Sequence, residues 1–323
     1  MNKAAEYLSK RKWGVFTHYL YSIVCNTEHV SNMNTGITDW NEAVNRVDVE
    51  RLAYRLHRMN VGYYFITLLQ GTKYMIAPNA TFDSIAGTAP GEACATRDLP
   101  MELAEALRKY DIDLCLYYTG DGPWMDEVIG KKFGFTAPRE NISEDFVKKW
   151  ASVLEEYALR YGDRVKAWWI DGCYSESAPH RSERFGYTDT LLDNYYNAVK
   201  KGNPNAAVTF NDGVYSLPVK YYYREDYTAG ECRGMCLKHP NSKYIDGSLN
   251  HVLFPLGVNS EFTGGAWAKS GTKYTKETLL AYIKRVGEIG GVVTVDIAPF
   301  IDGSFDPEQE AILRFVGENI DPK

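Results

Sequence analysis

Two acidic residues follow apolar, strand-like segments and could share one reaction. Asp171 ends the apolar run of residues 167–170, and Glu231 lies in a later loop. Glycoside hydrolysis needs two carboxyl groups, about 5–5.5 Å apart for retention and about 6.5–9.5 Å apart for inversion. One carboxyl group is ionised, and the other holds its proton through burial or a neighbouring charge. Asp171 with a later glutamate satisfies this inventory, although an Asp-Gly pair also forms turns.

The second carboxyl group has several candidates among the residues. Glu231 lies five positions after Asp226, which favours it, and Glu176 is the runner-up. Glu225 and Asp226 are further rivals in the same stretch of chain. The residues alone therefore predict a carboxylate pair without fixing its second member.

Two other polar positions close expected strands. His18 lies late in the first strand, where a histidine is either structural or a substrate contact. Asn211 and Asp212 end the strand of residues 207–210, where they either line a site or turn the chain. Serine hydrolase chemistry has no local support, because no serine has the GxSxG context.

Composition excludes several classes of protein. The chain has 323 residues, of which 45% are hydrophobic and 24% charged, and its net charge is −6. These values are typical of a folded globular chain, and no run of about 18 apolar residues predicts a membrane span. No dense basic cluster or membrane anchor appears, so we expect neither a nucleic-acid partner nor a membrane partner. The 24 tyrosines and 7 tryptophans suit either core packing or stacking on sugar rings.

The six cysteines predict reduced, buried thiols. None forms a CxxC pair, and the spacing of Cys232 and Cys236 has no matching His or Cys pair for zinc. We therefore expect no metal and no cofactor. The first residues lack the apolar segment of a signal peptide, which predicts a cytoplasmic protein. A periplasmic or secreted protein trimmed of its leader would show the same N-terminus.

Strands and amphipathic helices alternate along the chain. We expect strands over residues 12–21, 62–69, 112–118, 165–171, 207–211 and 291–297, and helices over residues 48–59, 100–109, 143–160, 188–201, 275–289 and 307–319. This alternation predicts parallel strands with right-handed crossovers. GxGxxG and P-loop motifs are absent, which favours a (β/α)8 barrel of the TIM type, an α/β fold, over a doubly wound sheet.

Long inserts follow the expected strands at residues 26–47, 70–99, 119–142 and 212–265. Loops that follow the strands build the active site of a barrel, so the inserts lie on the functional side. No linker or internal repeat divides the chain. We expect one catalytic domain over residues 1–323.

Five short motifs in order resemble glycoside hydrolase family 29, the retaining α-L-fucosidases. They are WGVFTHYLYS at 13–22, YYT at 117–119, WIDG at 169–172, DYTAGE at 226–231 and GGVVTVDIAPFIDGSFDPEQ at 290–309. The resemblance implies that Asp171 is the nucleophile and Glu231 the acid/base. It also implies that His18 and Trp169 contact the sugar, with Tyr118 nearby.

The resemblance extends more loosely to other positions. Asp39 and Trp40 stand where the family often has Glu-Trp, and Trp267 could close the pocket from a late loop. Gln70 lies where family members carry a His pair that binds fucose hydroxyls, and Asn211 marks the Asn-Asp pair after the fifth strand. These residues are our remaining candidates for substrate binding.

Two departures from the family pattern bear on the sugar. The segment LQGTKY at residues 69–74 lacks the family's two histidines, and Gly213 replaces the family's arginine. A pocket built to hydrogen-bond a hydroxyl rejects analogues that lack it, so these losses change which sugar is accepted. The chain also ends shortly after the last expected helix, and we expect no C-terminal β-sandwich.

The sequence therefore predicts a retaining, exo-acting glycosidase that cleaves a terminal α-L-fucoside or a related sugar. Its partner would be an oligosaccharide or glycoside substrate, and the oligomeric state stays open, including a homo-oligomer. The alternative is a carbohydrate-binding pseudo-enzyme on the same barrel, suggested by the missing His pair and arginine. Lyase or isomerase chemistry on a sugar is a third class, without a metal or nucleotide motif to support it.

Overall fold

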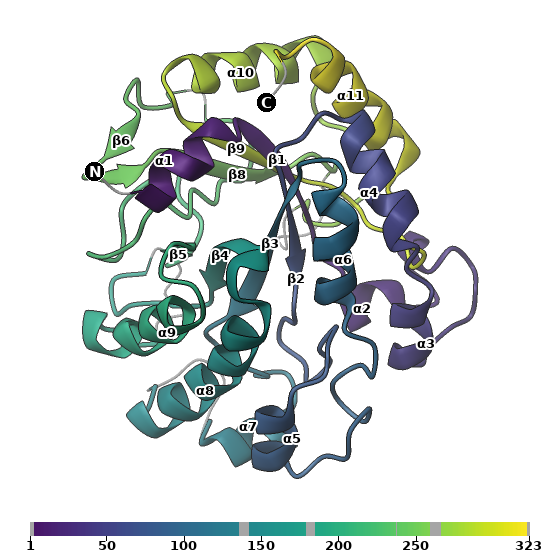
Figure 1. The fold of residues 1–323 in the computed structure, drawn as a ribbon, viewed down its shortest axis with the longest axis vertical. Coiled ribbons are helices and arrows are strands. Elements are labelled where there is room, and N and C mark those ends of the chain that lie inside the picture. The colour runs from purple at the N-terminus through teal and green to yellow at the C-terminus, as the bar shows by residue number, and fades with distance from the viewer. Residues whose placement is uncertain (1–2, 136–141, 179–184, 237, 259–265, 322–323) are drawn as a thin grey trace.

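Seven parallel strands form the central sheet of this computed structural model (Figure 1). The structure describes residues 3–135, 142–178, 185–236, 238–258 and 266–321. The strand order is β5-β4-β3-β2-β1-β9-β8, and every neighbouring pair is parallel. The strands are β1 (Trp13–Thr17), β2 (Tyr63–Thr67), β3 (Asp113–Thr119), β4 (Val165–Asp171), β5 (Ala207–Phe210), β8 (His251–Pro255) and β9 (Val292–Asp296).

Helices follow the strands and cover the outside of the sheet. They are α1 (Lys3–Lys10), α2 (Tyr21–Val24), α3 (Trp40–Asn45), α4 (Val49–Arg58), α5 (Ala80–Ala86), α6 (Leu99–Arg108), α7 (Glu127–Phe133), α8 (Glu144–Tyr161), α9 (Asp189–Gly202), α10 (Lys276–Glu288) and α11 (Pro307–Glu318). Polar residues at the N-caps fix where several helices begin; Asp48, Asp98, Ser143 and Thr275 each accept a backbone N–H. Two short strands, β6 (Tyr244–Ile245) and β7 (Ser248–Leu249), form a small hairpin.

An irregular segment, residues 226–232, lies between the two edge strands β5 and β8. The amide of Asp226 donates to the carbonyl of Val208 in β5 at 2.8 Å. On the other side, Leu253 of β8 donates to Gly230 at 2.9 Å. A Cβ at Gly230 would lie 2.0 Å from the carbonyl oxygen of His251, so only glycine permits this close approach. The segment thus connects the edges of the seven-stranded sheet.

Two hydrophobic clusters lie on opposite sides of the sheet. The larger one fills the space between the strands and the outer helices. The smaller one contains Phe16, Phe65, Tyr117 and Trp169, whose side chains alternate with outward-facing neighbours on their strands. Helix α1 adds Ala4, Ala5 and Leu8 to this inner cluster.

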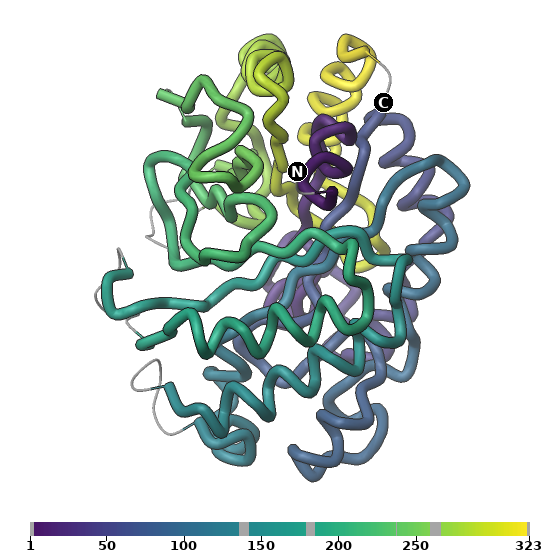
Figure 2. The backbone as a smooth tube through the Cα atoms, turned by 60° about the vertical axis from the view of Figure 1, so that its left-hand side comes forward, coloured from purple at the N-terminus to yellow at the C-terminus, as the bar shows by residue number. Residues whose placement is uncertain are grey.

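Helix α1 covers the amino-terminal ends of the strands. Its Tyr7 and the following Arg11 bind Asp113, the first residue of β3, and the Arg11 Nε–Asp113 Oδ2 distance is 2.6 Å. Both chain ends lie at this side of the molecule (Figure 2). Lys12, which follows α1, donates to the carbonyl of Asp321 near the other end of the chain. Helix α1 does not cover the opposite, carboxyl-terminal ends of the strands, where the loops that follow the strands lie.

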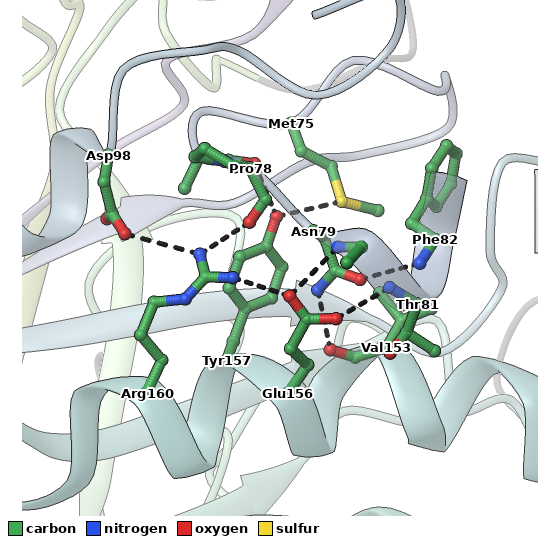
Figure 3. A network of polar contacts seen from close by, with 12 residues as sticks. Met75, Pro78, Asn79, Thr81, Phe82, Asp98, Val153, Glu156, Tyr157 and Arg160 are labelled. Atoms are coloured by element: carbon green, nitrogen blue, oxygen red, sulfur yellow. Dashed lines mark hydrogen bonds and ion pairs between the residues drawn. The ribbon is translucent and has the colours of Figure 1, made fainter. Parts of the chain in front are cut away.

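Helix α8 anchors the insert that follows β2. Glu156 accepts the amides of Ala80 and Thr81 at the start of α5, and Arg160 donates to the carbonyl of Pro78 at 2.6 Å (Figure 3). Asn79 caps α5 and also donates to the carbonyl of Val153 at 3.0 Å. Helices α8 and α9 run side by side in both views of the chain (Figures 1 and 2).

The predicted alternation of strands and helices is confirmed, as are a parallel sheet and an α/β class. Strand β8 was not predicted, because it lies inside the insert expected at residues 212–265 and carries a histidine, an aromatic residue and a proline. In the described part of the chain, seven strands join the sheet rather than eight. The inserts predicted at 119–142 and 212–265 fall partly outside the described residues. No described helix has the length and apolar character needed to span a bilayer.

Candidate active site

A cavity of about 190 Å³ opens at the carboxyl-terminal ends of the strands. Parallel strands of an α/β fold present their functional residues at this edge. The cavity is lined by Phe16, His18, Leu20, Ile23, Gln70, Trp169, Asp171, Glu231, Leu253 and Trp267. Six of the ten positions singled out by the sequence lie on this wall.

The Asp171 carboxylate, at the end of β4, receives three donors. The hydroxyl of Tyr117 donates to Oδ2 at 2.7 Å, and the amide of Asn211 donates to Oδ1 at 2.8 Å. Gln70 makes a longer contact with Oδ2, at 3.5 Å. Burial raises the pKa of Tyr117 well above its usual value, and the negative charge of Asp171 adds to this effect. The hydroxyl of Tyr117 therefore stays protonated and donates to the carboxylate.

Asn211 links the two candidate carboxyl groups. Its Nδ2 atom lies 2.8 Å from Oδ1 of Asp171 and 2.5 Å from Oε2 of Glu231. Asn211 follows β5, and Glu231 comes from the segment that lies between β5 and β8. Asp171 and Glu231 thus face the same cavity from neighbouring parts of the sheet edge.

His18 is held by a buried partner. Its Nδ1 atom lies 2.7 Å from Oδ2 of Asp296, the last residue of β9. Asp296 also accepts the amide of Ala268 at 2.9 Å. Burial raises the pKa of Asp296, and the neighbouring His18 opposes that shift. With a carboxylate at Nδ1, that nitrogen carries a proton, and the ring orientation is fixed by the same contact.

Aromatic rings form much of the wall. Trp169 and Tyr117 are stacked, with centroids 5.5 Å apart and planes 22° apart. Trp169 donates its indole N–H to the carbonyl of Ala229 at 3.0 Å, which ties β4 to the segment before Glu231. The ring centroids of Trp267 and His18 are 5.5 Å apart. Such faces suit the apolar side of a sugar ring.

Three predicted substrate contacts lie away from the cavity, and these predictions need correction. Tyr118 is fully buried on the other face of β3, where it stacks on Trp150 of α8 and donates to its carbonyl at 3.0 Å. Side chains alternate along a strand, so Tyr117 points toward Asp171 and its neighbour Tyr118 points toward α8. The prediction selected the wrong member of this pair.

The Asp39–Trp40 pair has a structural role instead. Asp39 is exposed and caps α3 by accepting the amide of Glu42 at 2.8 Å. Trp40 is buried and donates its indole N–H to the carbonyl of Met75 at 2.7 Å. Neither side chain lines the cavity.

The rival carboxylates are also placed elsewhere. Glu176 is exposed and lies outside the cavity wall. Asp226 pairs with Lys200 at 2.9 Å and accepts the amide of Val208. Glu225 is buried, accepts the amide of Tyr221 at 3.0 Å, and burial raises its pKa to about 8. Glu231 is the rival that the structure brings next to Asp171.

Several residues that line the cavity or hold its lining residues in place were missed by sequence reasoning. Tyr117 and Asp296 lie inside motifs that the sequence singled out, and strand alternation was the signal that could have favoured Tyr117. Leu20, Ile23 and Leu253 give no sequence signal, because their place on the wall depends on how the chain folds.

A second cavity, of about 320 Å³, opens at the opposite ends of the strands. Among its charged residues, Arg11 forms ion pairs with Asp111 and Asp113. Among the described residues, no group of three or more His, Cys, Asp or Glu side chains could hold a metal ion.

Comparisons with known proteins identify a family and related folds for this chain. A family model described as Alpha-L-fucosidase matches residues 84–321, about three-quarters of the chain. A solved α-L-fucosidase of glycoside hydrolase family 29 from Bacteroides thetaiotaomicron has a TM-score of 0.63 at 16% identity, covering 98% of this chain and 73% of that one. The search of curated protein sequences returned no match.

Endo-fucoidan hydrolases from glycoside hydrolase family 107 share the fold as well. One has a TM-score of 0.68 at 14% identity, covering 98% of this chain and 64% of that one. Another has a TM-score of 0.69 at 14% identity and is covered over 54% of its length. The chain thus spans between about half and two-thirds of the length of these two proteins. At such low identities, the likeness shows the fold alone.

Proposed function

The chain belongs to the alpha-L-fucosidase family, and from that premise we propose that it is a retaining glycoside hydrolase. Its substrate would be a glycoside with a terminal α-L-fucosyl residue or a closely related sugar. The observation that supports this most strongly is the bridge from Asn211 to both Asp171 and Glu231. Glycoside hydrolysis needs two carboxyl groups beside the scissile bond, and here two carboxyl groups share a donor at the wall of one cavity.

The spacing of the two carboxyl groups favours retention over inversion. Since one nitrogen lies 2.8 Å from the first oxygen and 2.5 Å from the second, those oxygens are at most about 5.3 Å apart. Retaining enzymes hold their carboxyl groups about 5–5.5 Å apart, whereas inverting enzymes need about 6.5–9.5 Å to admit a water molecule. This spacing supports the proposed double displacement through a glycosyl-enzyme.

In the proposed mechanism, Asp171 attacks the anomeric carbon of the sugar. Donors from Tyr117 and Asn211 hold its carboxylate in place. Glu231 protonates the departing oxygen, then takes a proton from the water that releases the sugar. We assign the nucleophile to Asp171 because the hydroxyl of Tyr117 and the amide of Asn211 both orient its carboxylate.

The cavity size supports action on a chain end. Its volume of about 190 Å³ is below the range of about 300–1,000 Å³ typical of drug-sized ligand sites, and suits a single sugar ring. Trp169 and Trp267 offer stacking surfaces, and His18 and Gln70 offer hydrogen-bonding groups. Leu20 and Ile23 add an apolar patch that suits a deoxygenated or substituted sugar position.

We also propose that the sheet is a (β/α)8-type barrel in one catalytic domain. Residues 226–232 would take the sixth strand position, because they hydrogen-bond to Val208 of β5 and Leu253 of β8. Tyr227 and Ala229 of this segment join the inner cluster with residues from the strands. The segment is irregular because Gly230 adopts a positive φ of 63°.

A panel of aryl glycosides tests the proposed function. We expect hydrolysis of an aryl α-L-fucoside or of a related aryl deoxyhexoside, with the retained anomer appearing first by NMR. Asp171→Asn should abolish this hydrolysis while leaving the thermal unfolding temperature near that of the wild type. Sugar binding without turnover across the panel would instead identify a carbohydrate-binding pseudo-enzyme. An unsaturated product would identify a lyase, and cleavage of a polysaccharide at internal bonds only would contradict exo action.

A further inference from the structure

A pair of cysteines lies directly beyond Glu231 in the chain. The Sγ atoms of Cys232 and Cys236 are 2.9 Å apart, and both residues are buried. We propose that Cys232 and Cys236 form a redox-active dithiol that converts reversibly to an intrachain disulfide with a small, anionic disulfide of the glutathione class. The proposal is independent of the glycosidase activity.

The fold holds these two thiols together from outside the loop. Tyr274 accepts the amide of Met235 at 2.9 Å, and Tyr282 of α10 accepts the amide of Cys236 at 3.2 Å. At the other end, the amide of Cys232 donates to the carbonyl of Leu253 in β8 at 2.9 Å. The backbone is held on both sides of the pair, and disulfide formation needs the two Sγ atoms to move from 2.9 Å to about 2.05 Å apart.

The thiols are reachable from solvent through a separate cavity. Cys232 and Cys236 both line a cavity of about 590 Å³, which is distinct from the cavity at Asp171. Arg233 and Lys238 also line it, and its described lining residues include no aspartate or glutamate. A small disulfide that carries carboxylates would therefore enter a site of positive charge.

The environment makes one sulfur the nucleophile. The hydrogen bond from Cys232 lowers the pKa of Cys236, and His239 lowers it further, against the opposing effect of burial. The same hydrogen bond raises the pKa of Cys232, and burial raises it too. Thiol–disulfide exchange proceeds through the thiolate, so Cys236 is the attacking residue.

The exchange balances in two steps. The Cys236 thiolate attacks one sulfur of the small disulfide, whose S–S bond breaks and releases one thiolate. Cys232 then loses its proton to solvent and attacks the Cys236 sulfur of the mixed disulfide, releasing the second small thiolate. The protein loses two electrons and two protons, and the small disulfide is reduced to two thiols.

The other described cysteines have no such arrangement. Burial raises the pKa of four thiols, those of Cys25, Cys94, Cys115 and Cys173. Among the described residues, the hydrogen bond between two thiols is that of Cys232 and Cys236 and includes none of these four. The sequence prediction of reduced, buried thiols therefore suits these four residues. For Cys232 and Cys236 the structure indicates reactive thiols instead.

Mass mapping of the thiols in the full-length protein tests the proposal. The reduced protein is equilibrated with oxidised glutathione, its remaining thiols are alkylated after unfolding, and its peptides are analysed. We expect Cys232 and Cys236 to become protected as a pair at least tenfold faster than Cys25, with loss of two hydrogens and recovery on adding dithiothreitol. Equal rates for all six cysteines, or complete alkylation of this pair, would overturn the proposal.

Two matched variants identify the attacking sulfur. Cys232→Ser should accumulate a glutathione adduct on Cys236, because the resolving thiol is missing. Cys236→Ser should leave Cys232 at least tenfold less modified. The reverse pattern would contradict the assignment, and the wild-type mapping stands even if a variant fails to fold.

Discussion

Asp171 and Glu231 are joined through a single amide nitrogen, that of Asn211. This bridge fixes two carboxyl groups from different parts of the sheet edge at one separation. It also gives each of them a donor, so neither faces the cavity without a hydrogen bond. The proposed double displacement depends on this geometry, because nucleophile and acid/base must act on the same glycosidic bond.

Removing the bridge should slow the reaction without unfolding the protein. We expect Asn211→Ala to lower kcat by about 10- to 100-fold, since a hydrogen bond to a charged group contributes about 1.5–3 kcal/mol. Steady-state kinetics on an aryl glycoside measures this change, and circular dichroism checks the fold. A variant with wild-type kcat would show that the bridge is not needed for catalysis.

Two adjacent tyrosines provide a matched pair of variants. Tyr117 donates to Asp171, whereas Tyr118 donates to the carbonyl of Trp150 on the other face of β3. Tyr117→Phe should lower kcat by about tenfold or more and change stability little. Tyr118→Phe should leave kcat unchanged and lower the free energy of unfolding by about 0.5–1.5 kcal/mol, because one buried hydrogen bond to the carbonyl of Trp150 is lost. Kinetics and urea unfolding of both variants test this. A loss of kcat in Tyr118→Phe but not in Tyr117→Phe would contradict the prediction.

Azide rescue distinguishes the two glutamates considered for proton transfer. Glu231→Ala should lower activity by about 10²–10⁴-fold, and azide should restore turnover of a substrate with an activated leaving group. Azide needs no general base, so it can replace water in the second step. Glu176→Ala is the control and should behave as the wild type, because Glu176 is exposed and outside the cavity. Rescue of the Glu176 variant alone would transfer the role to that residue.

Buried Glu225 should make stability depend on pH. Burial raises the pKa of Glu225 from its ordinary value of 4.5 to about 8 in the folded protein. Between these values the unfolded chain has lost this proton and the folded chain retains it. The free energy of unfolding therefore falls as pH rises through this window, by on the order of 1 kcal/mol per pH unit.

The variant Glu225→Gln removes this titration. Its stability should change less than that of the wild type between pH 5 and about pH 8, as measured by urea unfolding at several pH values. Parallel pH profiles for the two proteins would contradict the assignment of this group. Lys220, Thr209 and the backbone of Tyr221 surround the carboxyl group and are unchanged in the comparison.

Much of the fold followed from periodicity, because most strands and helices carry clear apolar patterns. The segment around Gly230 did not, since its pairing depends on a glycine approaching the carbonyl of His251. Asp171 was predicted from its place at the end of an apolar strand, where parallel sheets present functional groups. The sequence placed Tyr118 at the sugar, although only the register of β3 decides which tyrosine faces inward.

Some site residues lie beyond the reach of sequence patterns. The hydrogen bond between His18 and Asp296 joins residues 278 positions apart, and no local sequence pattern predicts that the two side chains meet. Leu20 and Ile23 reach the cavity from the short helix α2 and the turn before it, where apolar residues are common. Trp40 was a candidate because the Asp39–Trp40 pair resembles the family's Glu-Trp, but its indole N–H donates to the carbonyl of Met75.

Covalent trapping tests the central claim most directly. The protein is incubated with a 2-deoxy-2-fluoro glycosyl fluoride of the sugar that it hydrolyses, and the intact mass and the peptides are then measured. We expect one glycosyl unit per chain, attached to the peptide that carries Asp171, and no labelling of Asp171→Asn. A label on any other residue, or turnover of the natural sugar by Asp171→Asn at the wild-type rate, would contradict the assignment of the nucleophile.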